Sequence, residues 1–175
     1  MEKEFILIMP SIKDRIDWLE YYKEFKKVNP DSNPLDYRLG QDYEQWLSEK
    51  EDESKGLNLQ EGRVPSSVYL LKIEDNDRIL GHVSIRHSID NEFLEKVGGH
   101  IGYGIRPSER GKGYAKILLN LALKFCKELG IENVMITCKK NNIPSAKCIK
   151  SNGGILRDEI NYKGEDFNRY DFKLD

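Results

Sequence analysis

Alternating apolar residues in the first half of the chain predict strands that pair as antiparallel hairpins. A first strand is expected at residues 2–9. Two more are expected at 68–73 and 79–89, because the polar cluster 75–77 between them has the composition of a tight turn. Ser11 is a suitable N-cap for a helix, since apolar residues follow it at helical spacing.

The strand expected at 79–89 has two chemically different faces. Its apolar residues alternate so that His87 shares their face and Arg86 points to the opposite one. A lone histidine on an apolar face is more often a core residue, so we expect His87 in the core. His82 stands five residues before His87 and therefore on the other face, which argues against a shared metal site.

The second half of the chain changes to a pattern in which strands and helices alternate. A strand at 100–106 contains Gly102 and Gly104, and glycines inside a strand often mark the close approach of another backbone or a ligand. Residues 113–129 predict the clearest helix, because they carry one broad apolar stripe that ends before Gly130. Further elements follow in chain order: a strand at 134–138, a short helix at 142–152 and two strands within 155–174. The whole pattern predicts a mixed α/β fold with antiparallel hairpins early and a βαβ unit late.

Composition narrows the class of protein. The chain has 175 residues, the size of one domain, of which 38% are hydrophobic and 33% charged, and this balance excludes disordered, collagenous and membrane classes. A net charge of −2 gives no electrostatic basis for binding nucleic acid. We expect a cytoplasmic protein without a membrane partner, because the segment before the first apolar run is acidic and three cysteines stand apart without a CxxC pair: Cys126, Cys138 and Cys148.

The segment between the strand at 100–106 and the long helix carries two glycines and two cations. The first turn of a helix has unpaired N–H groups and the positive end of the helix dipole. Gly111 and Gly113 let those groups close around an anion, and Arg110 and Lys112 add positive charge. A phosphate or pyrophosphate is the natural ligand of such a loop.

Two familiar phosphate loops do not fit this segment. A P-loop needs a glycine where Arg106 stands and a hydroxyl residue after the lysine, where Gly113 stands. A dinucleotide-binding fingerprint needs a third glycine at the position of Lys116.

The pattern Arg110-x-x-Gly113-x-Ala115 resembles the pyrophosphate motif of the GNAT superfamily of N-acetyltransferases, Gln/Arg-x-x-Gly-x-Gly/Ala. The resemblance is specific over residues 99–156. It implies a GNAT-like fold, in which a mixed, mostly antiparallel central sheet is flanked by helices, and a single N-acetyltransferase domain over residues 1–175. It also implies that a primary amine attacks the thioester of acetyl-CoA directly and takes up its acetyl group, with no metal involved.

The same resemblance implies which residues bind acetyl-CoA. The loop would hold the pyrophosphate through its cations and its N–H groups: Arg110, Gly111, Lys112, Gly113, Tyr114 and Ala115. The strand backbone at Tyr103, Gly104 and Ile105 would pair with the pantetheine arm, and glycine at 104 suits that close approach. Asn142 and Ser145 match a second segment of the family that contacts the cofactor, and they would lie near the thioester sulfur.

The catalytic groups are less well defined. The family often has a tyrosine acid where Ile149 stands and a phenylalanine where Gly154 stands, so the proton donor is open. His100 is our candidate for the general base, because its reference pKa near 6.5 suits the task, although a structural histidine is the more frequent case. Glu92 and Glu95 are weaker candidates, because they lie in a connection that could reach the cleft, and Tyr162 and Tyr170 are weaker candidates for the acid.

The acceptor is the least defined part of the function. In this family the region corresponding to residues 29–62 shapes the acceptor side, and its acidic run at 49–53 suggests a small-molecule or peptide amine that is cationic. Acidic runs are more often solvated helix faces. Homodimers are common in the family, but no exposed apolar stripe decides the assembly. The alternative function is a non-catalytic acyl-CoA-binding or sensing module, which Ile149 and the absence of a clear base favour.

Overall fold

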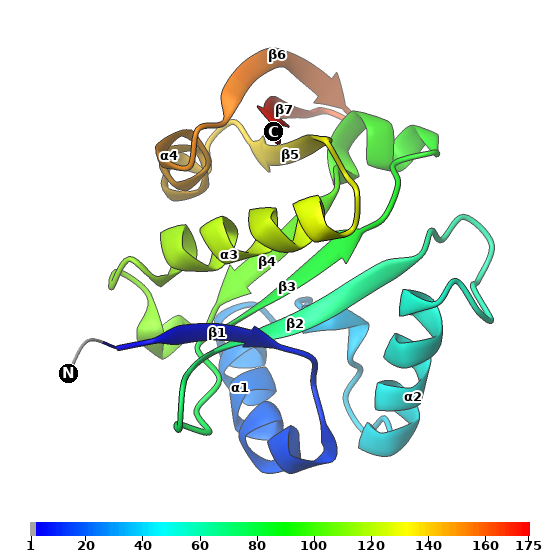
Figure 1. Ribbon diagram of the computed structural model, residues 1–175, viewed down its shortest axis with the longest axis vertical. Coiled ribbons are helices and arrows are strands. Elements are labelled where there is room, and N and C mark those ends of the chain that lie inside the picture. Colours follow the sequence, from blue (N-terminus) through cyan, green and yellow to red (C-terminus); the bar gives the residue numbers. More distant parts are fainter. Residues whose placement is uncertain (1–2) are drawn as a thin grey trace.

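The computed structural model describes residues 3–175, which form two antiparallel sheets with helices packed around them (Figure 1). The first sheet has the strand order β1-β2-β3-β4, so neighbours in the chain pair with one another. Its strands are β1 (Phe5–Ile8), β2 (Ser66–Ile73), β3 (Gly81–Arg86) and β4 (Ile101–Ile105). The expected hairpins are confirmed, although the first and third strands are shorter than predicted, and Glu2 lies outside the described residues.

The second sheet is separate from the first and has the order β5-β7-β6. Its strands are β5 (Asn133–Lys139), β6 (Ile155–Tyr162) and β7 (Glu165–Lys173). The mostly antiparallel character of the predicted central sheet is confirmed, and the structure divides its strands into two sheets between β4 and β5. The unit β4–α3–β5 crosses from one sheet to the other, where a βαβ unit was expected.

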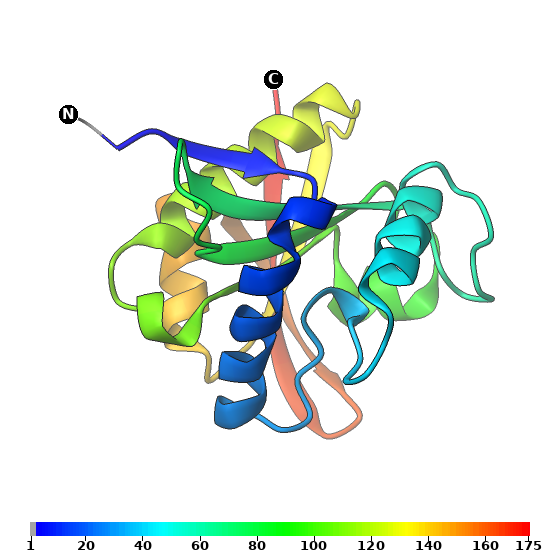
Figure 2. The ribbon, with the colours of Figure 1, turned by 90° about the horizontal axis from the view of Figure 1, so that it is seen from below.

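Helices cover both faces of the first sheet. Figures 1 and 2 show α1 (Arg15–Val28) and α2 (Tyr43–Ser54) on one face and α3 (Tyr114–Glu128) on the other. The helix α4 (Ile143–Ser151) packs against α3 and β5. Short helical turns join these elements: η1 (Ile12–Asp14), η2 (Pro34–Asp36), η3 (Leu94–Gly98) and η4 (Pro107–Glu109). The predicted α/β fold class is confirmed.

The two faces of the first sheet are held by different cores. On the α3 face the core is aliphatic and continues into β5, α4 and β7. On the α1 face it is aromatic: Trp18 of α1 stacks on Trp46 of α2 with ring centroids 4.8 Å apart. The Trp46 indole donates to the Leu35 carbonyl at 3.1 Å, which fixes the chain between the two helices. Ser11 and Asp14 form the expected helix cap as a capping box.

The two sheets touch at one end of the gap between them. The N–H of His100, just before β4, donates to the carbonyl of Met135 in β5 at 2.8 Å, and the N–H of Met135 donates to His100 Nδ1 at 2.9 Å. Gly99 makes this contact possible, because its φ is +62° and a Cβ there would lie 2.6 Å from the Met135 carbonyl oxygen. Beyond this contact the strands separate, and a cavity opens between them.

Candidate active site

A cavity of about 850 Å³, called here the inter-sheet cavity, lies between β4 and β5. Its walls are the two strand edges and its far end is formed by the N-termini of α3 and α4. Nine of the eleven residues predicted to bind the cofactor line it: Tyr103, Ile105, Arg110, Gly111, Gly113, Tyr114, Ala115, Asn142 and Ser145. Residues that are far apart in the sequence therefore meet in one place.

The edge of β4 that faces the inter-sheet cavity carries backbone groups that are not bonded to β3. Hydrogen bonds from Arg86 N–H to the His100 carbonyl and from Arg106 N–H to the Leu80 carbonyl bracket the β3–β4 ladder. Antiparallel bonds alternate, so the polar groups of Gly102 and Gly104 point to β3 while those of Tyr103 and Ile105 point to the cavity. An extended ligand could pair with these two residues as an added strand does.

Gly104 has a different role from the one predicted. It does not line the inter-sheet cavity, and a Cβ there would lie 2.7 Å from the His82 ring. His82 is its partner on β3, and its Nδ1 is hydrogen bonded to the Tyr21 hydroxyl. Gly104 therefore makes room for a histidine on the opposite face of the sheet rather than for a ligand.

The loop before α3 has the geometry of an anion site. Gly111 and Gly113 have φ values of +77° and +81°, a conformation that other residues rarely adopt. Gly113 is the N-cap of α3, no side chain caps the helix, and its first turn has no acidic residue. The N–H groups of that turn therefore stay available for an anion at the end of the inter-sheet cavity.

The two predicted cations of the loop differ in position. Arg110 lines the inter-sheet cavity; its Nε donates to the Ile105 carbonyl at 3.2 Å, and its guanidinium lies over the Phe25 ring. Lys112 does not line the cavity, because its ammonium pairs with Glu109 Oε2 at 2.6 Å. Arg110 is therefore the loop cation placed to meet a phosphate.

At the N-terminus of α4, Asn142 and Ser145 form a compact polar group. The Asn142 side chain accepts a hydrogen bond from the Ser145 N–H at 3.3 Å and so caps the helix. The Ser145 hydroxyl lies 3.0 Å from the Tyr103 hydroxyl, which reaches across the gap from β4. Burial raises the pKa of the Tyr103 phenol well above its usual value, so the group stays protonated at neutral pH.

The structure explains both departures from the family pattern together. Ile149 is fully buried in the core beneath α4. A Cβ on Gly154 would lie 2.6 Å from Ile149 Cγ2, 2.8 Å from Phe172 Cζ and 3.0 Å from the Ile149 carbonyl oxygen, so the packing leaves no room for a side chain at 154. Neither position can supply a proton donor.

The predicted catalytic candidates line neither the inter-sheet cavity nor a second, polar cavity that is described below. His100 lines neither, and its Nδ1 already accepts the Met135 N–H; a general base must reach the amine, so this position favours the structural interpretation. Glu92 pairs with Lys96 on the surface. Glu95, Tyr162 and Tyr170 also line neither cavity, and Tyr170 is a core residue.

The three cysteines are buried, and two of them border the inter-sheet cavity. Cys126 belongs to the core, whereas Cys138 and Cys148 line the cavity. Burial raises the pKa of both thiols, so they are neutral and weakly nucleophilic at neutral pH. Cys148 is buried rather than exposed. Among residues 3–175 no three His, Cys, Asp or Glu side chains come together as a metal site.

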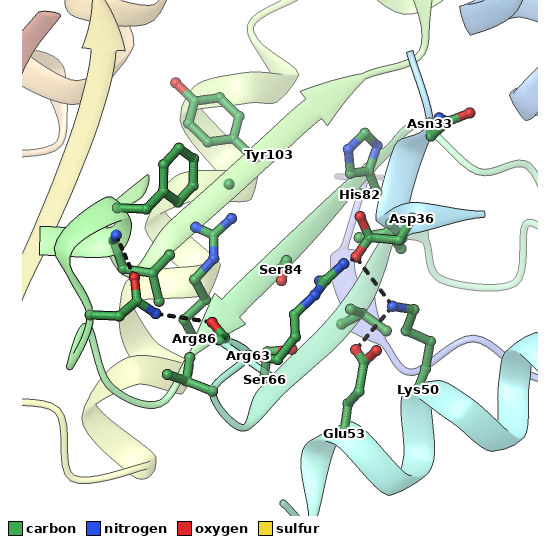
Figure 3. Close-up of a pocket in the computed structure, with 18 residues that line it drawn as sticks. Asn33, Asp36, Lys50, Glu53, Arg63, Ser66, His82, Ser84, Arg86 and Tyr103 are labelled. Atoms are coloured by element: carbon green, nitrogen blue, oxygen red, sulfur yellow. Dashed lines mark hydrogen bonds and ion pairs between the residues drawn. The ribbon is translucent and has the colours of Figure 1, made fainter. Parts of the chain in front are cut away.

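A second cavity, called here the polar cavity, has a volume of about 480 Å³ and lies beside α2 (Figure 3). Charged residues from four parts of the chain line it. Six residues of the predicted acceptor region contribute part of its wall: Asn33, Leu35, Asp36, Lys50, Glu53 and Gly62. The two cavities share four residues at β3 and β4, where they meet: Arg86, Phe93, Gly102 and Tyr103.

The charges on one side of the polar cavity neutralise one another. Asp36 accepts from Arg63 Nη1 at 2.8 Å and from Lys50 Nζ at 3.5 Å, and Lys50 also contacts Glu53 at 2.9 Å. The hydrogen bond to Arg63 and the neighbouring cations hold the pKa of Asp36 below its usual value in spite of the burial. Figure 3 shows the Arg86 guanidinium on the other side, toward Tyr103.

Comparison with known proteins agrees with this geometry. The family model of the acetyltransferase (GNAT) family matches residues 20–153, so the chain belongs to this family. It is an acetyl-CoA-dependent N-acetyltransferase. The uncharacterized N-acetyltransferase YnaD of Bacillus subtilis is 26% identical over 141 residues, which are 78% of this chain and 72% of YnaD.

Solved structures show the same fold. RimJ of Mycobacterium smegmatis, in complex with CoA-disulfide, superposes with a TM-score of 0.69 at 16% identity, covering 97% of this chain and 81% of RimJ. The yncA protein of Salmonella typhimurium, assigned as an acetyltransferase and bound to its cofactor acetyl-CoA, superposes with a TM-score of 0.64 at 13% identity, covering 98% of this chain and 94% of yncA. Within residues 3–175 no helix is long and apolar enough to cross a membrane.

Proposed function

We propose that this protein transfers the acetyl group of acetyl-CoA directly to a primary amine that is bound in the polar cavity. The observation that carries the proposal is the meeting of two different cavities at Tyr103. One ends at an uncapped helix N-terminus suited to a pyrophosphate, and the other is lined by polar side chains. Two substrates entering from the two cavities would meet at β4.

The chain's own residues supply the contacts that this reaction needs. Arg110 and the N–H groups of Gly111 to Ala115 would hold the pyrophosphate, as the open first turn of α3 supports. The backbone groups of Tyr103 and the N–H of Ile105 would orient the pantetheine arm, because the Ile105 carbonyl already accepts from Arg110 Nε. Acetyl-CoA supplies the acetyl group as a thioester; the amine nitrogen bonds to the acetyl carbon, the carbon–sulfur bond breaks, and the amine loses a proton to solvent.

Tyr103 would serve as the hydrogen-bond donor to the leaving sulfur, a role that Ile149 cannot fill. Its hydroxyl lies between the cavities and is held by Ser145, on the helix where the family's tyrosine usually stands. Because burial keeps the phenol protonated, Tyr103 would donate a hydrogen bond to the leaving sulfur. A hydrogen bond to a charged group contributes about 1.5–3 kcal/mol, enough to matter for the rate. Sequence spacing could not show this role, since 42 residues separate Tyr103 from Ser145.

Direct transfer is favoured over a covalent acetyl-enzyme. Cys138 and Cys148 are the thiols that border the inter-sheet cavity, and burial keeps both in their neutral form. A weak nucleophile offers no advantage over the amine itself. The polar cavity opens at the same point, so the amine has its own route to the thioester.

Thermal unfolding with acetyl-CoA, with adenosine as a control that lacks the pyrophosphate, tests the binding site. At about 100 times its Kd a ligand adds roughly 2.7 kcal/mol, which would raise Tm by roughly 5–10 °C in a domain of this size. Release of free CoA thiol with a panel of primary amines then tests the transfer. Binding without thiol release across the panel would support the alternative, a non-catalytic acyl-CoA-binding or sensing module.

A further inference from the structure

We propose that the acceptor is a small molecule in which a carboxylate or phosphonate group lies a few bonds from the amine, and that Arg86 binds this anionic group. The proposal rests on the function proposed above and names the substrate class of the polar cavity.

Arg86 has donors that the protein does not use. Its Nη1 donates to the carbonyls of Gly98 and Gly99 at 3.0 and 3.1 Å. A guanidinium has five N–H donors, so the three on Nε and Nη2 are left over. The side chain is partly buried at the junction of the two cavities. The N–H groups on Nε and Nη2 of Arg86 are therefore available to donate to an acceptor on a ligand in the cavity.

Arg86 also lacks a negative partner. Among residues 3–175 no carboxylate lies within ion-pair distance of its guanidinium, whereas the other arginine of the polar cavity, Arg63, is paired with Asp36. Burial lowers the pKa of Arg86, and Arg63 lowers it further, while the charge of Asp36 raises it without offsetting the loss of hydration. A ligand anion would supply the missing charge.

A buried arginine with a structural role looks different in this chain. Arg106 is also removed from solvent, and it meets two carboxylates: Asp17 at 3.0 Å and Glu24 at 2.7 Å. The fold therefore provides anions where an arginine only holds elements together. At Arg86 it provides only two carbonyls and leaves the guanidinium facing the cavities.

The charge of the polar cavity agrees with an anionic group. Its lining has three cations, Lys50, Arg63 and Arg86, against the two carboxylates of Asp36 and Glu53. Both carboxylates are engaged by Lys50, so the excess positive charge resides on Arg86. His82 adds no charge, because burial lowers its pKa to about 4.

This assignment changes the earlier expectation of a cationic acceptor, which was drawn from the acidic run at 49–53. The structure places Glu49 and Glu51 in solvent on α2, away from the polar cavity. Of the run's carboxylates only Glu53 lines the cavity, and it is paired with Lys50. The run therefore offers little free negative charge to an acceptor.

The position of Arg86 sets the size of the acceptor. Arg86 and Tyr103 both border the two cavities, so an anion on Arg86 lies close to the point where the amine must meet the thioester (Figure 3). The amine and the anion must then be separated by few bonds, as in an amino acid or an aminoalkylphosphonate. A cavity of about 480 Å³ is ample for such a molecule.

The test uses matched acceptors that differ only in the anionic group. Rates of CoA thiol release are measured with amino acids against the corresponding amino acid amides, and with aminomethylphosphonate against methylamine. We expect kcat/KM to be about tenfold or more higher for the anionic member of a pair. The two arms also show whether a carboxylate or a phosphonate is preferred.

Three variants locate the effect. Arg86→Gln keeps an amide donor for the two carbonyls but removes the charge, so the preference for the anionic member should fall to near unity, while Arg86→Lys should keep part of it. Arg157→Gln is the matched control, because Arg157 pairs with Asp171 on the outside of β6 and lines neither cavity. Its preference should equal that of the wild type.

Two results would overturn the proposal. One is wild-type enzyme that uses amides as well as acids, which decides the matter even where the Arg86 variants do not fold. The other is an Arg86→Gln enzyme that binds acetyl-CoA more weakly yet keeps the preference, which would assign Arg86 to the co-substrate. If acetyl-CoA binds but no amine releases thiol, the proposed transfer fails on its own. Binding of the same amine pairs in the presence of acetyl-CoA then decides the acceptor class, with equal affinities counting against it.

Discussion

His100 and Met135 hold each other through two hydrogen bonds: the main chain of His100 donates to the Met135 carbonyl, and the main chain of Met135 donates to the His100 ring. The second bond uses the imidazole as an acceptor, so the ring must be neutral. This pair joins β4 to β5 at the closed end of the inter-sheet cavity. The inter-sheet cavity is therefore closed at one end by His100, the residue that the sequence presented as a candidate base.

Replacing His100 with alanine separates the structural role from the catalytic one. The buried N–H of Met135 loses its acceptor, so the free energy of unfolding should fall by roughly 1–3 kcal/mol. In the folded fraction, kcat should change by less than about threefold. A general base would give the opposite result, a loss of about 10²–10⁴ in kcat with little change in stability. Denaturant unfolding and steady-state kinetics on the same preparation distinguish the two.

Acid should destabilise the protein through its histidines. Burial lowers the pKa of His82 to about 4 and also lowers those of His87 and His100. As the pH falls through about 6.5, these histidines therefore become protonated in the unfolded chain while they stay neutral in the folded chain. The free energy of unfolding should be constant just above that pH and fall as the pH drops toward 4. His82→Gln should make this dependence shallower, and an unchanged slope would contradict the burial of His82.

Gly113→Ala should weaken acetyl-CoA binding without unfolding the protein. The positive φ of Gly113 disfavours alanine by roughly 1–2 kcal/mol, while a Cβ there meets no atom within 4 Å. The strained loop should raise the KM for acetyl-CoA by about tenfold. Gly130→Ala is the matched control: its φ is +77°, its Cβ also meets nothing, and it lies at the other end of α3. Equal KM values for the two variants would contradict the binding of the pyrophosphate by this loop.

Tyr103→Phe should reduce kcat by about 10–100-fold, because the leaving sulfur loses its hydrogen-bond donor. The Kd of acetyl-CoA, measured by thermal shift, should stay within about twofold, since the ring and the backbone groups remain. Tyr43→Phe serves as the control, because it removes a hydroxyl that donates to the Ser11 carbonyl away from both cavities. A Tyr103→Phe enzyme with wild-type kcat would exclude the hydroxyl from the reaction.

The geometry of the loop before α3 could be predicted because its determinants are local. The two glycines, the cation at 110 and the apolar stripe of α3 all lie within one stretch of chain, and the structure places them as expected. The face of Arg86 also followed from alternation along its strand. The hydrogen-bond partners of that side chain could not be predicted from the sequence, because they are the carbonyls of Gly98 and Gly99 in the segment before β4.

The positions that were misread are those whose role depends on a distant partner. Gly104 was interpreted as room for a ligand, but the side chain that needs the room is His82 on the neighbouring strand. Lys112 was predicted to be one of the cations that bind the pyrophosphate, but its ammonium forms an ion pair with Glu109. Tyr103 was valued only for its backbone, because its hydroxyl partner is 42 residues away. Spacing alone carries no information about such pairs.

The alternation of hydrogen bonds along β4 has a consequence for how the molecule exchanges its amide protons. Within the described residues, the amides of Gly102 and Gly104 are directed to β3, whereas those of Tyr103 and Ile105 face the inter-sheet cavity. Adjacent amides on a single strand should therefore exchange with heavy water at unequal rates. A ligand lying along this edge would slow the exchange of only every second amide, so protection at alternate residues of β4 would report that the edge is occupied.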